Sequence, residues 1–479
     1  MTTTEKTSSN TKNDSGLREG VMSGPELAAQ AIASIAPSAV IAFTAAEIFL
    51  GAGTGTIYAF VLATAVILCV GYIVSFFAKR FPSAGSLYTY VSKGLGPTAA
   101  FIAGMALMIG SWGIATGSLN GAVSFTMDVL RLLGLSSIEG ITWAVILTIT
   151  IGGLATFFTI QGIRASARVS FVLELVSIAI ILVLLISALF WAGAAGWDPS
   201  QFTLEETPFQ GVAAGMVLAI LGFVGFSSAD ALGREARNPK KAIPRAIMWS
   251  ALGVGILYVF AAYTQIAVLG DELGSVASPL EAMHEKIGMP FWFGPVLLFG
   301  VAASFFAVVV APLNVVGRII YVMGKEGVLP EAFGRTHDQH LTPHRGLWLA
   351  GGLMITLDII MIVTGNNLMD TLVWVDTYAT YGYMLSYALV AIAGVAYIKK
   401  HNIKNPLLPV LAMAAVLAMA YVFFANIWPV PDFPVNILPY LFVITMLAGF
   451  ARYRYAIKKD PKVTERIGNT HTEMMEGVG

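Results

Sequence analysis

Long apolar stretches recur along the whole chain, and they constrain its fold more than any other feature. A helix of about 20 apolar residues crosses the hydrocarbon core of a bilayer, and charges, prolines and glycines separate twelve such stretches here. Only 12% of the residues are charged, against about 25% in a typical soluble protein. We therefore predict an all-α integral membrane protein whose twelve transmembrane helices lie near residues 27–51, 56–78, 98–127, 140–160, 167–194, 209–233, 246–269, 293–323, 346–364, 371–398, 405–427 and 435–456.

Lysine and arginine are distributed unevenly between the two sides of the membrane. If the N-terminus is cytoplasmic, all but two of the 28 basic residues fall in cytoplasmic segments, and only Arg131 and Lys286 lie outside. An excess of basic residues is typical of cytoplasmic loops. We therefore expect a multi-pass protein of the cell (inner) membrane with both termini in the cytoplasm. Residues 1–26 are predicted to form a disordered tail, residues 27–456 the twelve-helix domain, and residues 457–479 a second tail.

The residue types that carry catalysis or bind metals do not gather into recognisable motifs. The sequence has one cysteine, Cys69, and neither a nucleotide-binding loop nor a zinc-ligand spacing. His337, His340 and His344 could bind a metal, but we favour a solvated loop for these three residues between two helices. We expect no cofactor, no metal and no nucleic-acid partner, and a protein that moves a solute across the lipid bilayer instead of an enzyme.

Two of the predicted helices contain residues that interrupt a helix. In the first, Pro37 removes a backbone donor, so the helix is expected to break near residues 34–39. Non-helical backbone within a membrane is tolerated where it lines a cavity, and interrupted helices in matching places of two repeats indicate a transporter's binding site. Close packing by small residues is the alternative for either break alone. The residues that could break the sixth helix are Gly222, Gly225, Ser227 and Ser228.

The segment that follows the second break carries a family resemblance. The sequence GFSSADALGREARNPKKAIPRAI resembles the signature of the amino acid–polyamine–organocation superfamily of permeases, in which E-x-x-N-P-x-x-x-I-P-R follows helix 6. FPSAGSLYTYVSKGLGP resembles the family's P-x-A-G-G-x-Y-x-Y segment, with Ser86 in the place of the second glycine. GIRASARV and APLNVVGRIIYVMGKEGVLP resemble its segments at helices 5 and 8. The signature residues after helix 6 are Glu235, Asn238, Pro239, Ile243, Pro244 and Arg245.

The resemblance implies the fold of a bacterial amino acid permease. Two inverted five-helix repeats would span about residues 27–194 and 209–398, with helices 1 and 6 broken, and two trailing helices would span 405–456. A small-molecule substrate would bind between helices 1 and 6. The implied contacts are Ala36, Pro37 and Ser38 in helix 1, and Phe223, Gly225, Phe226, Ser227, Ser228 and Asp230 in helix 6.

The helix 1 segment departs from the family pattern. Many members have a Gly-x-Gly segment there, whose amides hold the substrate carboxylate, whereas this chain has Ala36-Pro37-Ser38-Ala39. Free amides near Pro37 could still bind a carboxylate, but the change favours an amine-bearing substrate. Phe223 and Phe226 could close over a ligand, and core packing is the alternative for both.

Acidic side chains within the predicted spans are candidate functional groups, because a charge in mid-membrane costs about 2.5–3.5 kcal/mol. Glu174 is the strongest candidate. It lies one turn from Ser177, near which some family members carry a lysine in place of a sodium ion, and we interpret it as a proton carrier or as a structural hydrogen-bonding residue. Asp230 could contact a ligand or pair with Arg234, and we favour the pairing slightly. The other candidates are Glu47, Asp358 and Asp376.

Taken together, these features predict a secondary active transporter for an amino acid or a small organic amine. Proton-coupled symport by alternating access is the mechanism we expect, with exchange of two related amines as the alternative. A solute channel is a hypothesis of a different class. The absence of a repeated filter motif or of pore-lining charge rings argues against it.

Overall fold

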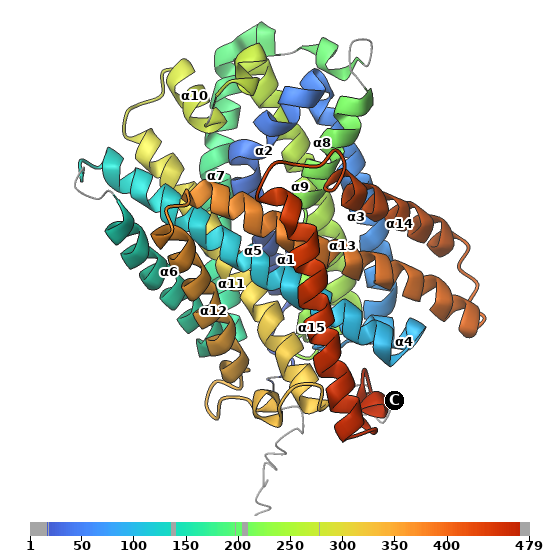
Figure 1. Ribbon diagram of the computed structural model, residues 1–479. Coiled ribbons are helices and arrows are strands. Elements are labelled where there is room, and N and C mark those ends of the chain that lie inside the picture. Colours follow the sequence, from blue (N-terminus) through green and yellow to red (C-terminus); the bar gives the residue numbers. More distant parts are fainter. Residues whose placement is uncertain are drawn as a thin grey trace, which may run out of the picture.

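A computed structural model describes Leu17 and residues 19–135, 140–196, 198–203, 209–276 and 278–469, and it consists almost entirely of helices (Figure 1). Of the two predicted tails, residues 1–16, residue 18 and residues 470–479 lie outside the described residues. In the described part, the one backbone pairing of β type joins Met22 to Ala236. The predicted all-α class is confirmed.

Every predicted span has a helical counterpart. The first apolar segment, Gly24–Ala78, is long enough for two crossings and holds α1 (Gly24–Ile35), α2 (Pro37–Ala52), a short 3₁₀ turn η1 (Gly53–Gly55) and α3 (Thr56–Ala78). The sixth span consists of α8 (Phe209–Leu221) and the 3₁₀ helix η4 (Ser228–Leu232). The remaining spans are α5 (Pro97–Leu132), α6 (Ile141–Gln161), α7 (Ile163–Ala192), α9 (Pro239–Leu269), α11 (Phe293–Lys325), α12 (His344–Val363), α13 (Leu368–Lys400), α14 (Leu407–Ala425) and α15 (Leu438–Lys459).

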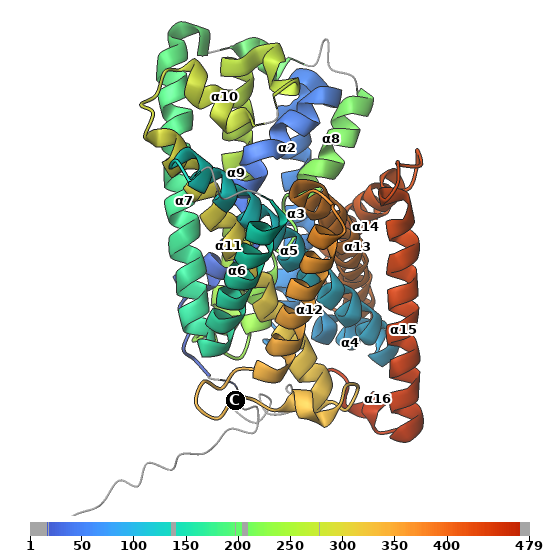
Figure 2. The same cartoon turned by 60° about the vertical axis from the view of Figure 1, so that its left-hand side comes forward.

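Short helices lie at the two ends of the bundle. The helices α4 (Leu87–Leu95) and α16 (Val463–Arg466) lie at one end, and α10 (Pro279–Lys286) lies at the other (Figure 2). We call the first the basic end, because the loops after α3 and before α9 and the last turn of α15 carry basic residues there. The remaining short turns are η2 (Gly193–Gly196), η3 (Pro199–Phe202), η5 (Gly270–Gly274), η6 (Glu331–Gly334) and η7 (Val435–Ile437).

The centre of the bundle is formed by α5, α11 and α13, and α5 packs against both of the others. Small residues allow the close approach of α5 and α13, since a Cβ added to Gly382 would lie 2.3 Å from the carbonyl oxygen of Ala106. Around this centre, α1 packs on α7, α9 and α11, and α2 packs on α8. This packing surrounds the two halves of the first span with four other helices.

Segments near both chain ends pack at the basic end. The N–H of Met22 donates to the carbonyl of Glu235 (2.8 Å), and the N–H of Arg237 donates to the carbonyl of Met22 (2.9 Å). Ordered structure therefore begins before residue 27, the first residue that we assigned to the helical domain. Near the other end, the N–H of Gly468 donates to Oε1 of Glu326 (2.9 Å), just after α11.

Candidate functional site

The first span breaks at a single residue. Helix α1 ends at Ile35, and Ala36 adopts a left-handed conformation (φ 56°, ψ 56°) before α2 begins at Pro37. Proline has no N–H to donate and its fixed φ suits the first position of a helix. The chain therefore ends one helix and starts another within the predicted window, and the expected break is confirmed.

The sixth span breaks over a longer segment, residues 222–227, between α8 and η4. Gly225 has φ 90°, a conformation that L side chains rarely adopt, and a Cβ at this position would lie 2.6 Å from the carbonyl oxygen of Ser34. Glycine therefore supplies both the turn and the space. The two breaks lie against each other, as a site between helices 1 and 6 requires.

The residues that we predicted to contact a substrate are closed to solvent in this structure. Phe223 packs edge-on against Tyr258, with ring centroids 5.0 Å apart, and Phe226 packs against Tyr387 at 5.4 Å. The two phenylalanines thus serve in the core in this conformation. All nine predicted contacts are buried: Ala36, Pro37, Ser38, Phe223, Gly225, Phe226, Ser227, Ser228 and Asp230.

Glu174 on α7 joins three helices beside the first break. Its Oε1 accepts hydrogen bonds from the hydroxyl of Ser38 (3.0 Å) and from the N–H of Ser38 (3.3 Å). Its Oε2 accepts one from the hydroxyl of Ser304 on α11 (2.6 Å). Glu174 is fully buried, and among the described residues no cation pairs with it. The Ser38 amide, one of the amides near Pro37 that could have bound a substrate carboxylate, is thus occupied by a carboxylate of the chain.

Asp230 on η4 lies on the other side of the second break, towards α4. Its Oδ1 accepts a hydrogen bond from the hydroxyl of Ser86 (2.5 Å), and its buried Oδ2 has no partner among the described residues. Our interpretation that Asp230 pairs with Arg234 is wrong, because the Arg234 guanidinium forms its ion pair with Glu19 (3.2 Å). Ser86 itself has φ 52°, a conformation that glycine adopts without steric cost, and the family pattern that this segment resembles has glycine at this position.

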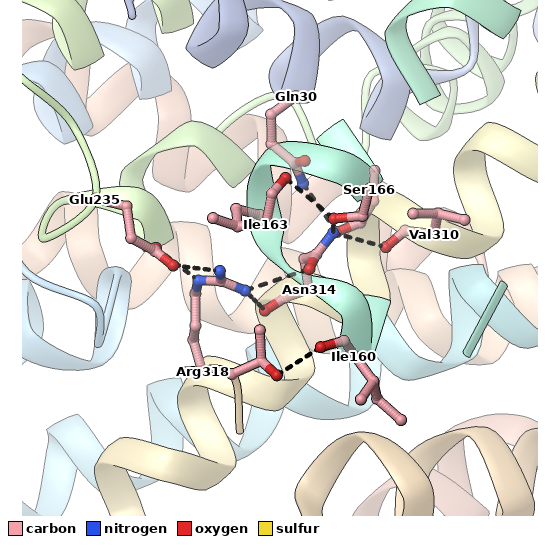
Figure 3. A network of polar contacts seen from close by, with 10 residues as sticks. Gln30, Ile160, Ile163, Ser166, Glu235, Val310, Asn314 and Arg318 are labelled. Atoms are coloured by element: carbon pink, nitrogen blue, oxygen red, sulfur yellow. Dashed lines mark hydrogen bonds and ion pairs between the residues drawn. The ribbon is translucent and has the colours of Figure 1, made fainter. Parts of the chain in front are cut away.

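The sequence analysis missed a buried ion pair between α11 and the segment that follows η4. Arg318 on α11 donates to both carboxylate oxygens of Glu235 (2.6 and 2.9 Å), and both side chains are nearly inaccessible (Figure 3). Arg318 also donates to the carbonyl of Asn314 (2.7 Å), whose side chain reaches Ser166 on α7 (3.1 Å). We counted Arg318 as a loop cation and Glu235 as a motif residue. The only sequence signal for this pair was that Glu235 lies in the motif after helix 6 and Arg318 in the family-like segment at helix 8.

The remaining acidic candidates lie away from the breaks. Asp358 on α12 is fully buried and accepts a hydrogen bond from Asn120 (2.8 Å). Asp376 on α13 has one buried oxygen without a partner among the described residues. Glu47 is exposed near the end of α2. None of these three contacts a residue of the two breaks through a hydrogen bond in the part of the chain described here.

The histidine loop brings three imidazole rings together, one pair tilted and the other edge-on. The ring of His337 lies 4.7 Å from that of His340 and 5.3 Å from that of His344. Over the described residues, no group of three or more histidine, cysteine or acidic side chains has an arrangement that could hold a metal ion.

The sequence matches known membrane transporters over most of its length. A model of the amino acid permease family matches residues 26–449. The chain is 24% identical over 435 residues to the branched-chain amino acid permease BcaP of Bacillus subtilis, a match that covers 86% of this chain and 88% of that protein. It is 29% identical over 321 residues to the low-affinity putrescine importer PlaP of Escherichia coli, with 64% and 68% covered. The methylthioribose transporter of Bacillus subtilis is 25% identical over 378 residues, with 75% and 78% covered.

The fold also matches a solved structure, the crystal structure of MhsT in complex with L-phenylalanine. The TM-score is 0.59 at 13% sequence identity, and the match covers 85% of this chain and 99% of that one. At this identity the likeness concerns the fold alone. It agrees with the broken-helix, repeat-based fold class that the sequence implies.

Proposed function

The chain belongs to the amino acid permease family, and from this premise we propose that it carries an amino acid or a small organic amine across the cell membrane by proton-coupled symport. That it is a permease and not an enzyme follows from the family and from its transporter relatives. The substrate, the coupling to protons and the mechanism of access are our proposal. The observation that carries it is the set of contacts made by Glu174.

The proposed mechanism is alternating access around the two helix breaks. The substrate sits between residues 36–38 and 223–230. Spans 1, 2, 6 and 7, which are α1 with α2, α3, α8 with η4, and α9, rock against the rest of the bundle. The basic end faces the cytoplasm, as the positive-inside rule predicts. In the closed conformation described here, Arg318 and Glu235 hold the segment after η4 against α11 on that side. Opening towards the cytoplasm separates this buried pair.

Glu174 lies where a proton could control the movement of α2. It connects α2, part of the moving set, with α7 and α11, which belong to the rest. An ionised carboxylate accepts hydrogen bonds at both oxygens, whereas a protonated oxygen becomes a donor. A hydroxyl such as that of Ser304 can reverse its role, but the N–H of Ser38 can only donate. A proton on Oε1 therefore weakens the bond from the Ser38 amide and loosens α2 from α7.

The lack of a cationic partner in the described part of the chain supports this role for Glu174. Burying a carboxylate charge is costly unless it is paired, and the groups around Glu174 are hydroxyls and one amide. A structural role alone would be served by a neutral side chain at lower cost. A carboxylate in this position suits reversible protonation.

Substrate recognition is proposed to favour an amine group. The Ser38 amide is occupied, so the N-terminal turn of α2 offers less to a substrate carboxylate than a Gly-x-Gly segment would. Asp230 keeps one buried oxygen without a partner in the described chain, and a substrate ammonium would neutralise it. Relatives named for putrescine and for branched-chain amino acids fit a substrate class that includes both amines and amino acids.

A competition panel in proteoliposomes tests the proposal. Purified protein is reconstituted, a pH gradient is imposed, and uptake is compared for α-amino acids, γ-aminobutyrate-like compounds and polyamines. We expect saturable uptake of one of these classes that accelerates when the outside is acidic. Uptake that needs a second substrate inside and ignores the gradient would replace symport with exchange. Flux without saturation would favour a channel.

A further inference from the structure

A basic cavity lies at the basic end of the bundle, and none of the described residues that line it belongs to the two helix breaks. It has a volume of about 570 Å³ and lies between the end of α3, the start of α9 and Asn405 before α14. This volume falls within the range of about 300–1,000 Å³ that is typical of small-molecule sites. No acidic side chain is found among the described residues that line it. The basic residues that line it are Lys79, Arg80, Lys240, Lys241 and Arg245.

The five cations have no acidic partner in the described part of the protein. None of them forms an ion pair there, although acidic side chains neutralise other cations nearby, such as Arg234 with Glu19. The Arg80 guanidinium is held in position by its stacking on Phe76, at 3.8 Å, and by donation to the carbonyl of that residue (2.9 Å). Several unpaired positive charges around one cavity predict an anionic occupant.

The wall of the cavity also carries a buried polar group without a partner. Ser75, on the last turns of α3, lines the cavity, and its buried hydroxyl makes no hydrogen bond among the described residues. Buried polar groups are normally hydrogen-bonded. Tyr72 and Asn405, which also line the cavity, are fixed by a hydrogen bond to each other (3.2 Å). A phosphate in the cavity would give Ser75 the acceptor that it lacks.

The surroundings of the cavity distinguish a lipid phosphate from a free one. Trp249 on α9 lines the cavity and is 69% exposed, and tryptophan is enriched where a membrane meets water. Leu407, at the start of α14 and two residues from Asn405, is half exposed. A second cavity shares Lys241, Arg245 and Trp249 with the first. Charged and lipid-facing apolar groups therefore meet at this place.

We propose that this cavity binds the phosphate head group of an anionic phospholipid, with the acyl chains lying along the exposed face of α9 and α14. Basic pockets between transmembrane helices on the cytoplasmic side bind such head groups in other membrane proteins. The bound head group would connect α3 and α9 with the loop before α14. None of the proposed substrate contacts lines this cavity, so the lipid proposal does not depend on the proposed function.

Lipid binding to the full-length protein tests the proposal. Delipidated protein in a neutral detergent is titrated with phosphatidylglycerol, with phosphatidylcholine and with inorganic phosphate, and adducts are followed by native mass spectrometry. We expect phosphatidylglycerol to bind in preference to the other two. In the double variant Lys240→Gln/Arg245→Gln, its dissociation constant should rise about thirtyfold, at about 1 kcal/mol for each basic residue near the membrane. Lys458→Gln/Lys459→Gln, on exposed residues of α15 at the same end, is the charge-matched control and should leave it unchanged.

A neutral variant separates a head group in the cavity from general surface attraction. Ser75→Ala changes no charge and removes a hydroxyl that has no partner among the described residues. The variant should therefore fold normally and weaken phosphatidylglycerol binding by up to about tenfold. Equal binding of phosphatidylcholine, or equal losses in the α15 control, would overturn the proposal. Inorganic phosphate that binds as tightly as the lipid would assign the site to a free anion and overturn it as well.

Discussion

The carboxylate of Glu174 on α7 accepts hydrogen bonds from both the N–H and the hydroxyl of Ser38, the second residue of α2. The two residues are 136 positions apart in the sequence. The first N–H groups of a helix have no partner within it, and here a buried acidic side chain from another helix supplies one. The break at Ala36 is what makes this amide available inside the membrane.

Removing the second hydrogen-bond donor to Glu174 should affect both stability and transport. In Ser304→Ala, Oε2 loses its donor while staying buried, which should lower the free energy of unfolding by about 1–3 kcal/mol and change the dependence of uptake on pH. Thermal unfolding in detergent and uptake at several pH values measure this. Ser177→Ala removes a buried hydroxyl without a partner in the described structure, one turn along α7 from Glu174, and should change neither. Equal effects of the two substitutions would contradict a specific role of Ser304.

The pair Arg318–Glu235 should show strong coupling in a double-mutant cycle. Removing one partner alone, in Arg318→Met or Glu235→Leu, leaves a buried unpaired charge and should destabilise the closed conformation by about 3–5 kcal/mol. The double variant should recover most of that loss, because no buried charge remains. The free energies of unfolding of the four proteins give the coupling energy. Additive losses would show that the two side chains act independently.

Gly225→Ala should impair transport through the backbone. The added Cβ would lie 2.6 Å from the carbonyl oxygen of Ser34 at φ 90°, and a side chain in this conformation costs about 1–3 kcal/mol before the clash is counted. We expect uptake to be lost and stability to fall. Gly253→Ala in α9, where nothing lies within 4 Å, should be neutral or stabilising by up to about 1 kcal/mol. Normal uptake by Gly225→Ala would mean that the two breaks need not touch.

The contact between Glu326 and the C-terminal segment should weaken as the pH rises. Burial raises the pKa of Glu326 from 4.5 to about 8, while hydrogen bonds from Tyr88 and Gly468 act in the opposite direction. Between these pH values Glu326 holds a proton when the C-terminal segment is docked on it and has lost that proton when the segment is released. Release of the segment therefore becomes easier with rising pH up to about 8. Hydrogen exchange at the Gly468 amide should accelerate over this range beyond the intrinsic chemical rate. In Glu326→Gln, the acceleration beyond the intrinsic rate should vanish. If it stayed unchanged, it would contradict the proposal that Glu326 controls release of the segment.

The helices and their breaks could be predicted because their causes are local. Apolar runs longer than a bilayer is thick and a proline such as Pro37 act within a few residues of the chain. Glu174 could also be singled out, since a carboxylate in a membrane span is rare for physical reasons. Its partners could not, because Ser38 and Ser304 lie 136 and 130 residues away.

The errors of the sequence analysis also arise from contacts between segments that are distant in the sequence. Asp230 and Arg234 are separated by one helical turn, so local spacing favoured their pairing. The chain does not form a regular α-helix there, and the actual partners, Ser86 and Glu19, come from distant segments. Arg318 looked like one more cytoplasmic cation, because only the folded structure brings Glu235 to it.

Uptake driven by a pH gradient in proteoliposomes containing Glu174→Gln is the most direct test of the account. The amide side chain keeps the size of Glu174 and can still accept at one oxygen, but it cannot bind and release a proton at neutral pH. We predict that acidifying the outside accelerates uptake by the unchanged protein and by the control Glu47→Gln, whose side chain is exposed. Uptake by Glu174→Gln should not respond to the gradient. A full response in Glu174→Gln would contradict the proposal that this residue carries the coupled proton.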